Sequence, residues 1–576
     1  MTNWQRPSGT QGDLWLVRAS TVAVRESPKD CPTAKSAGLR QLLGPDPKPP
    51  RNLKALEDFT FAPLMGGLDL IEHKNWSLPR TIEELFRTKG KFDTSRPPAH
   101  PSLLEWTAHA LPGYLAAREA KLATVEDPAA HAIPMPFEWA ALYQSDRADS
   151  RGATRYERTA WGRRYASADG KVREMWLPSI GKARLDRPEA EKAALADVLA
   201  RGAVCGRPGF QKPYRPLNDS SPLPERVRVF GYGCGDGKAV LLLDWDQQEV
   251  RRLYREHSAP AFARVVEGSG AVPGSSCIRC KALTGCTVLQ RVPGLWGGLP
   301  GDIRRPRRSL SAWDLRLYDQ CPAQYHLTRQ LNLKSLRPEH ESAVRGRAVD
   351  ARLNDQHRQR PAGGCRTIAG PTDPVEWSAG GQNLGGQVAR QGAAMLAQHA
   401  WLCPIDGLSS SERVLVQHQV SCYVPELDVV VIATPDLLHT RSGGWVWRET
   451  KTAASRLWEG KPLMRSYPQL ALAVLLLAAG VLGGELQRSR VELELLYPDD
   501  STLEELDPSR AVVVEEARDI VAKLADPLLR DDSYNPTTGR HCHGCEAHSW
   551  CRPGAEYIAQ NPLPATTTSA AAEDPI

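Results

Sequence analysis

Residues 426–455 read ELDVVVIATPDLLHTRSGGWVWRETKTAAS and contain two short runs of β-branched and aromatic residues. The runs are Val429–Ile432 and Trp445–Trp447, and a Ser-Gly-Gly turn at 442–444 leads into the second. Glycine tolerates the positive φ angles that tight hairpin turns need. We therefore predict that the two runs form adjacent antiparallel strands.

Three chemically active side chains lie at the ends of these runs. Asp436 follows the first run, and Glu449 and Lys451 end the second. Alternate residues of a strand share one face, so Glu449 and Lys451 point the same way and the hairpin can bring Asp436 to them. Carboxylates suit Mg²⁺ or Mn²⁺, and an ammonium beside the ion would orient an attacking water. The trio indicates phosphodiester hydrolysis, and the alternative is an exposed hairpin that ends in a Glu/Lys pair.

The sequence around the hairpin alternates between helical and strand patterns. Strands are expected at 412–423, 427–433, 444–451 and 489–497. Helices are expected at 311–331, 340–357, 384–400, 467–482 and 509–525. This order predicts an α/β domain with a central mixed sheet flanked by helices.

The 13 cysteines include two triplets with the same C-x2-C-x5-C spacing. These are Cys277, Cys280 and Cys286, and Cys542, Cys545 and Cys551. An iron–sulfur cluster or a structural zinc ion normally takes four ligands, so each triplet needs a distant fourth. Cys31 and Cys321 both precede proline in similar contexts, and we assign Cys31 to the first triplet and Cys321 to the second. One or two 4Fe-4S clusters, zinc with the same ligands, and cysteines without metal are the alternatives.

The repeated cysteines divide the chain into two similar units, each closed by a four-cysteine metal staple. We expect the first unit at 1–290, a Gly/Pro-rich and basic linker at 291–308, and the second unit at 309–556. The remaining residues, 557–576, are rich in Ala, Thr and Pro, and we expect them to be a disordered tail.

The second unit resembles the PD-(D/E)XK nuclease superfamily. The resemblance rests on TPD at 434–436, on E-x-K-T from Glu449, and on Tyr467-Pro-Gln469 at the start of an apolar helix. It implies a restriction-endonuclease-like fold in which Asp436, Glu449 and the Thr450 carbonyl bind the metal. It also implies that Lys451 serves the attacking water and that Gln469 contacts DNA.

Within that superfamily the second unit looks most like RecB-like nucleases that carry an iron–sulfur cluster, such as the AddB type and the CRISPR-associated adaptation nucleases. There one cysteine precedes the core and C-x2-C-x5-C follows it, as Cys321 and the second triplet do here. Two positions depart from the pattern. Asp350 stands where a metal-binding histidine is expected after Gly346, and Ala473 stands where tyrosine is common. Asp350 can still bind a hard cation.

The first unit lacks these residues. Aligning DGKVREMWLPS with GGWVWRETKTA places Met175 opposite Glu449 and Leu177 opposite Lys451, and extending the alignment without gaps places Gly162 opposite Asp436. We therefore expect tandem restriction-endonuclease-like domains of which the first is degenerate and inactive.

Bulk composition constrains function only weakly. Lys and Arg number 73 against 67 Asp and Glu, so the formal charge is +6, which permits nucleic-acid binding without indicating it. The longest apolar run, 470–482, is shorter than the roughly 20 residues that span a bilayer. We expect a cytoplasmic, Mg²⁺- or Mn²⁺-dependent DNA nuclease with no membrane association, partnered by a helicase or another nucleic-acid-processing subunit. The alternative is a non-catalytic DNA-binding or assembly factor.

Overall fold

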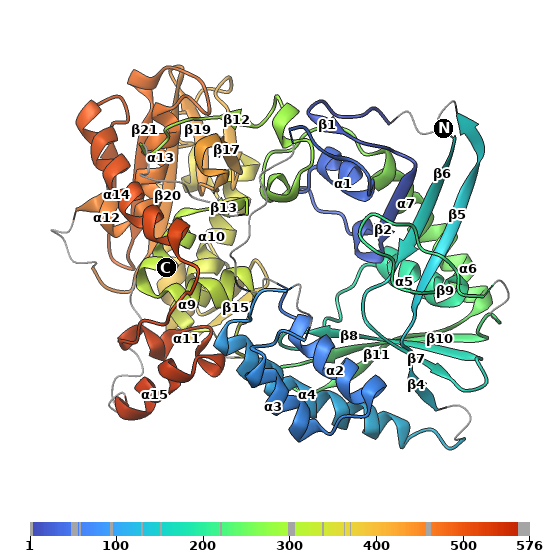
Figure 1. Cartoon of the computed structure of the whole chain (residues 1–576). Helices are drawn as coiled ribbons and strands as arrows, with labels where there is room; N and C mark the ends of the chain where they lie inside the picture. Colours follow the sequence, from blue (N-terminus) through green and yellow to red (C-terminus); the bar gives the residue numbers. More distant parts are fainter. Residues whose placement is uncertain are drawn as a thin grey trace.

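The computed structural model places two α/β units side by side, the first drawn in blue to green and the second in yellow to red (Figure 1). It describes residues 4–47, 56, 59–92, 96–127, 131–149, 152–218, 222–297, 306–336, 339–361, 363–368, 370–456 and 462–562. Across these ranges no helix combines the length and the apolar character that crossing a membrane requires.

The second unit is built on a five-stranded mixed sheet. Its strands lie in the order β16 (Val414–Val416), β19 (Leu437–Arg441), β20 (Gly444–Thr452), β21 (Arg490–Leu496) and β22 (Ser501–Leu506). All neighbours are antiparallel except β20 and β21, which are parallel and are connected through helix α13 (Pro468–Ala478). A parallel pair needs such a crossover connection.

Helices cover both faces of this sheet. On one face α13 and α14 (Ala511–Arg530) pack against Trp447 and Leu493. Helix α13 is apolar all round, as a fully enclosed helix should be. On the other face α10 (Glu341–Gln359) and α11 (Gly386–Leu402) pack through Leu353 and Met395 against Leu496. The predicted α/β class with a central mixed sheet flanked by helices is confirmed.

A smaller sheet contains the strand that was predicted to pair with β20. Its order is β12 (Gln290–Arg291), β17 (Val420–Val424), β18 (Val429–Ala433) and β13 (Arg308–Leu310). The predicted pairing of Val429–Ile432 with Trp445–Trp447 is wrong, because Thr434-Pro435 separates β18 from β19 and it is β19 that pairs with β20. Proline has no N–H for a ladder and so ends a strand. Both ends of the expected linker 291–308 are paired strands in this sheet.

The first unit repeats the large sheet strand for strand. Its order is β4 (Ala132–Pro134), β7 (Arg163–Ser167), β8 (Val172–Ser179), β10 (Arg226–Gly233) and β11 (Ala239–Asp246). Again every pair is antiparallel except one, β8 with β10, and a helix, α5 (Glu189–Arg201), connects these two strands. The same strand order and directions therefore recur in both units, as the predicted tandem arrangement requires.

The small sheet is also repeated in part. In the first unit it has the order β2 (Leu16–Ser20), β6 (Gly152–Thr159), β5 (Glu138–Asp149) and β9 (Ala203–Cys205), with β2 parallel to β6 as β13 is to β18. Besides α5, the α-helices described in this unit are α1 (Pro32–Leu39), α2 (Ala62–Lys74), α3 (Leu78–Arg87), α4 (Pro101–Leu122), α6 (Gln247–Leu253) and α7 (Ala259–Glu267). Two short antiparallel pairs complete the strands: β1 (Thr10–Gln11) with β3 (Gly44–Pro45), and the hairpin of β14 (Glu376–Ala379) with β15 (Gln382–Gly385).

Three element boundaries differ from the prediction. The expected helix 311–331 is broken at Cys321 into α8 (Ala312–Gln320), α9 (Pro322–Tyr325) and a π-helical turn, η6 (His326–Gln330), because a residue before proline is driven out of the helical region. The expected strand 412–423 is two strands, β16 and β17. The expected tail 557–576 is helical to Gln560 in α15 (Arg552–Gln560), which packs on the C-terminal cysteine segment, and 563–576 lie outside the described residues.

Candidate active site and cysteine centres

Three carboxylates of the second unit gather at the start of β19 and the middle of β20. The Asp436 Oδ2 atom accepts a hydrogen bond from the Thr450 backbone N–H at 2.7 Å. The Gln417 side-chain amide donates to Asp436 at 3.0 Å and to Asp350 of α10 at 3.2 Å. Gln417 thus bridges two carboxylates from different elements. Sequence reasoning missed Gln417, whose one local signal is its place between two strand-forming runs.

The third carboxylate, Glu449, is enclosed. Its Oε1 atom accepts a hydrogen bond from the Trp447 indole at 2.9 Å, and only 6% of the residue is exposed. Burial, followed by the negative charge of Asp436, raises the pKa of Glu449 to about 8. The same two causes raise the pKa of Asp350 to about 6, while the Lys451 ammonium opposes both shifts. Carboxylates held this close in a poorly solvated site call for a compensating cation.

Backbone geometry explains why these groups meet. The hairpin turn consists of Ser442 and Gly443, whose φ angles are +52° and +87°, so β19 and β20 stay in tight register. Leu437 pairs with Arg448, which places Asp436 beside Glu449. Helix α10 comes close to the end of β20, since a Cβ atom at Gly346 would lie 3.2 Å from the Thr452 hydroxyl. Asp350, one turn after Gly346, consequently reaches the site.

Gln469 is the remaining residue of the predicted site. It is half-buried in the first turn of α13, a helix that packs on β20 and β21, and no hydrogen bond joins it to Asp350, Asp436 or Glu449 in the described part of the chain. Ala473, one turn further, is fully buried in the core.

The equivalent place in the first unit has no carboxylate cluster. Val446 pairs with Arg490 and Val172 with Arg226, and this shared register aligns Met175 with Glu449 and Leu177 with Lys451, as predicted from sequence. Both residues are buried in an apolar core beneath α5. The prediction that Gly162 replaces Asp436 is wrong. Ten residues lie between Arg164 and its partner Met175, whereas twelve lie between Asp436 and Glu449, so the first hairpin is two residues shorter and Arg164 occupies the Asp436 position.

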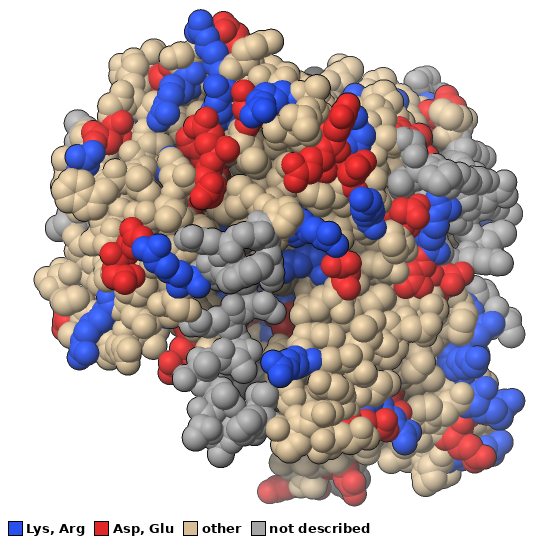
Figure 2. Space-filling model, turned by 90° about the vertical axis from the view of Figure 1, so that its left-hand side faces the viewer, with Lys and Arg blue, Asp and Glu red and all other residues tan. Residues whose placement is uncertain are grey.

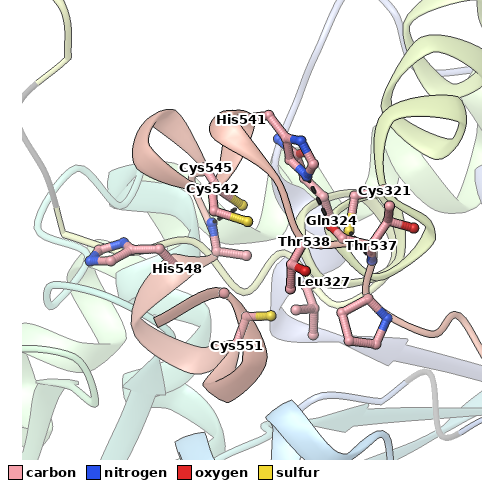
Figure 3. Close-up of a pocket in the computed structure, with 13 residues that line it drawn as sticks. Cys321, Gln324, Leu327, Thr537, Thr538, His541, Cys542, Cys545, His548 and Cys551 are labelled. Atoms are coloured by element: carbon pink, nitrogen blue, oxygen red, sulfur yellow. Dashed lines mark hydrogen bonds between the residues drawn. The ribbon is translucent and has the colours of Figure 1, made fainter. Parts of the chain in front are cut away.

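The C-terminal cysteine quartet lines one cavity. Cys321 comes from the α8–α9 break, and the triplet comes from the turns η10 (Arg540–Gly544) and η11 (His548–Trp550) and the residue after each. Figure 3 shows the triplet sulfur atoms turned toward the space that separates them from Cys321. Backbone N–H groups of Thr537 and Ala547 donate to the sulfurs of Cys321 and Cys545, each at 3.4 Å. Burial raises the pKa of the Cys545 thiol to about 12.

The first quartet has a parallel construction. Cys277, Cys280 and Cys286 lie on or beside the turns η4 (Ser275–Arg279) and η5 (Leu283–Gly285), and Cys31 caps the N-terminus of α1. The pKa of Cys280 is raised to about 11 by burial and then by the neighbouring Cys31, Cys277 and Cys286 thiols, so the four groups are close. Each predicted fourth cysteine therefore lies with its triplet.

The quartets are wider than a single-ion site. Among the described residues only His357, Cys365, His399 and Cys403 bring three or more ligand atoms within 4.8 Å of one another. A tetrahedral zinc ion with Zn–S bonds of about 2.3 Å needs sulfur–sulfur separations of about 3.8 Å. The sequence prediction did not include this third group, although His399 and Cys403 are spaced one helical turn apart, as metal ligands on a helix often are.

Charge on the surface is mixed. In Figure 2, Lys and Arg side chains alternate with Asp and Glu over the visible face. Within the basic run 304–308, Arg307 pairs with Asp428 at 2.6 Å, and Arg308 donates to the Leu528 carbonyl at 3.3 Å. These two arginines are structural, while Arg304 and Arg305 lie outside the described residues.

Comparison with known proteins supports the interpretation of the second unit. A search of curated proteins finds no match. Five chains of solved structures match, among them the one titled "Crystal structure of SSO0001", at 12% identity over 45% of this chain and 89% of that chain, with a TM-score of 0.23. Residues 309–552 match the family model of the PD-(D/E)XK nuclease superfamily. This part of the chain thus has the restriction-endonuclease-like fold and is similar to a superfamily whose members are generally nucleases.

Proposed function

We propose that the second unit is a divalent-metal-dependent nuclease that hydrolyses DNA phosphodiester bonds, on single-stranded or end-containing substrates. The observation that carries the proposal is the convergence of Asp350, Asp436 and Glu449 beside Lys451 in the segment that matches the nuclease family. Oxygen ligands of this kind prefer Mg²⁺ or Mn²⁺ to softer ions.

The donor set fits such an ion. Asp350, Asp436 and Glu449 would hold it, with the Thr450 carbonyl as a further ligand. When bound, it would polarise the phosphodiester and make a bound water more acidic. Burial, followed by the negative charge of Asp436, raises the pKa values of Asp350 and Glu449, which supports a compensating cation at this site.

The protein side chains supply the remaining functions. Lys451 is two residues from Glu449 on one face of β20, where its ammonium can orient the attacking water and stabilise charge that develops on the phosphate. Gln417 holds Asp350 and Asp436 in a fixed relation through two hydrogen bonds. Gln469, in the first turn of α13, is proposed to contact DNA next to the site.

The C-terminal quartet is proposed to hold a 4Fe-4S cluster. Four thiols around one cavity and two N–H···S bonds fit that group, and sulfurs this far apart favour a polynuclear cluster over one zinc ion. Because of this C-terminal quartet we also place the unit in the RecB-like iron–sulfur branch. Its proposed partner is a helicase or another nucleic-acid-processing subunit. The Cys31 quartet is proposed to hold a second cluster.

The first unit is proposed to be a degenerate, inactive nuclease-like domain that supports the second. Arg164, Met175 and Leu177 cannot reproduce the metal site, because they offer no oxygen ligand. Its contacts with the second unit are extensive: the Cys545 segment packs in the core that contains Trp106 and Trp176.

A cleavage assay tests the function. The full chain, purified without oxygen, is incubated with end-labelled single- and double-stranded DNA and with RNA, in Mn²⁺, Mg²⁺ or EDTA. We expect cleavage of DNA with either metal ion, none in EDTA, and none by the Asp436→Asn variant. Absence of metal-dependent cleavage by a folded, iron-loaded wild-type chain would favour the alternative, a non-catalytic DNA-binding or assembly factor.

A further inference from the structure

We propose that His357, Cys365, His399 and Cys403 bind a structural zinc ion, separate from both the carboxylate site and the cysteine quartets. The residues come from the last turn of α10, the short helix η7 (Gly364–Thr367), the last turn of α11 and the residue that follows α11. Their four ligand atoms all lie within 4.8 Å of one another, and all four residues are buried. Tetrahedral zinc bound by two sulfurs and two nitrogens needs ligand separations of about 3.3–3.8 Å.

The histidine orientations fit a metal. His399 Nδ1 lies 2.7 Å from the Glu494 carboxylate, which places a proton on Nδ1 and, in the neutral imidazole that binds a metal, leaves the lone pair on Nε2. That Nε2 atom faces His357 Nε2 at 3.0 Å, so both rings point their outer nitrogens into the same small space. A carboxylate that fixes the tautomer of a histidine ligand is a common feature of zinc sites.

A glycine turn positions Cys365. Gly363 and Gly364 have φ angles of +83° and +68°, and a Cβ atom at Gly364 would lie 2.8 Å from the Asp406 side chain and 2.9 Å from its backbone nitrogen. Glycine at these positions allows the chain to turn so that Cys365 faces Cys403. The Cys365 N–H then donates to the Cys403 sulfur at 3.4 Å. Such a bond stabilises a thiolate in a closed, buried site.

The ligand set identifies the metal and its task. Two thiolates and two imidazoles select zinc over Mg²⁺ or Mn²⁺, and four protein ligands with no exposed position indicate a structural rather than a catalytic ion. The ion would fasten the C-terminal end of α10 to that of α11. Asp350 lies two turns before His357 on α10, so the ion would also fix the helix that brings Asp350 to the carboxylates.

A second connection runs through Glu494 of β21. Its Oε1 atom binds His399, and its Oε2 atom accepts from the Thr450 hydroxyl at 3.2 Å. The Thr450 N–H in turn holds Asp436. Zinc binding would therefore order both α10 and β20, which carry the carboxylate site. This consequence rests on the proposed function, whereas the zinc site itself does not.

Metal analysis of the full chain tests the proposal. Protein expressed in zinc-supplemented medium and kept reduced is measured for zinc and iron by mass spectrometry, and its zinc is examined by X-ray absorption. We expect about one zinc per chain with two sulfur and two nitrogen neighbours. Cys403→Ser and His357→Gln should each lose that zinc and keep their iron, whereas Cys422→Ala, which alters a buried cysteine of β17 outside all three groups, should keep both metals.

Several outcomes would overturn the proposal. These are a reduced wild-type chain that takes up no zinc, zinc surrounded by sulfur alone, or a Cys365–Cys403 disulfide found by peptide mapping. If the variants do not fold, the X-ray absorption of the wild-type zinc still decides. Since none of these measurements uses DNA, a chain without nuclease activity can still confirm or reject the zinc site.

Discussion

The two large sheets share strand order and strand directions, but they carry different side chains at the positions that form the carboxylate site in the second unit. In the second unit the neighbouring strands β19 and β20 bring together Asp436, Glu449 and Lys451. In the first unit the same positions hold Arg164, Met175 and Leu177, and the latter two lie in an apolar core. A fold therefore does not determine function, which depends on the residues placed on it.

One buried ion pair is reversed between the units. Arg448 and Glu492 face each other across β20 and β21, at 2.6 Å and almost fully enclosed. The equivalent residues are Glu174 and Arg228, at 3.5 Å, where Glu174 also binds Arg118 of α4 at 3.2 Å. The ladder position thus needs charge complementarity, and either direction of the pair satisfies it.

The largest effect is expected from removing a ligand of the second quartet. Cys321→Ser should yield insoluble or colourless protein, because free energy of metal binding becomes free energy of folding when no site exists in the unfolded chain. Iron content, visible absorption and solubility are the readouts, with Cys422→Ala as the buried-cysteine control. Normal iron content in Cys321→Ser would remove Cys321 from the ligand set. Comparing Cys31→Ser will show whether the first quartet holds a second cluster.

The next largest effect is expected from substitutions in the carboxylate site, which should remove catalysis. Glu449→Gln or Lys451→Ala should lower the cleavage rate by about 10³-fold or more without unfolding the chain, because each removes charge placed for the transition state. The matched control is Asp169→Ala, an exposed carboxylate in the β7–β8 loop, which should keep full activity. Near wild-type cleavage by either site variant would refute the site, and a large loss in a folded Asp169→Ala would give the first unit chemistry of its own.

Breaking the reversed ion pair should lower the free energy of unfolding by different amounts in the two units. Glu492→Gln removes the 2.6 Å partner of the buried Arg448, which keeps only the Glu494 carboxylate at 3.7 Å, and should destabilise the chain by about 3 kcal/mol. Arg228→Gln leaves Glu174 with Arg118 and should cost about 1 kcal/mol. Urea unfolding followed by tryptophan fluorescence measures both. Equal losses would mean that Arg118 does not compensate for the missing Arg228.

The smallest effect concerns pH. The pKa of Glu449 is raised to about 8, so below that pH its carboxyl holds a proton that a bound cation must displace. Mn²⁺ affinity should therefore rise with pH from about 6 to 8, by at most about tenfold per unit for one proton released. Calorimetric titration at several pH values measures this rise, and it should be flatter in Glu449→Gln. An affinity independent of pH would show that Glu449 is ionised before the metal binds.

Sequence alone could predict the local parts of this account. The strand-forming run at 445–447, the two-residue spacing of Glu449 and Lys451, and the cysteine spacings all lie within short segments. Prediction from sequence failed where contacts between segments distant in the chain determine the structure. Pairing of β20 with β19 rather than β18 depends on the break at Pro435. The replacement of Asp436 by Arg164 depends on a hairpin that is two residues shorter. The grouping of His357 and Cys365 with His399 and Cys403 depends on how α10 and α11 pack.

We propose that the repeated sheet carries a hard-cation site in one unit only. Crystals of the full chain soaked in Mn²⁺, with diffraction data collected at the manganese absorption edge, test it directly. We expect anomalous density among Asp350, Asp436 and Glu449 and none beside Arg164, Met175 and Leu177. Density at the first unit, or an empty carboxylate cluster at saturating Mn²⁺, would contradict it.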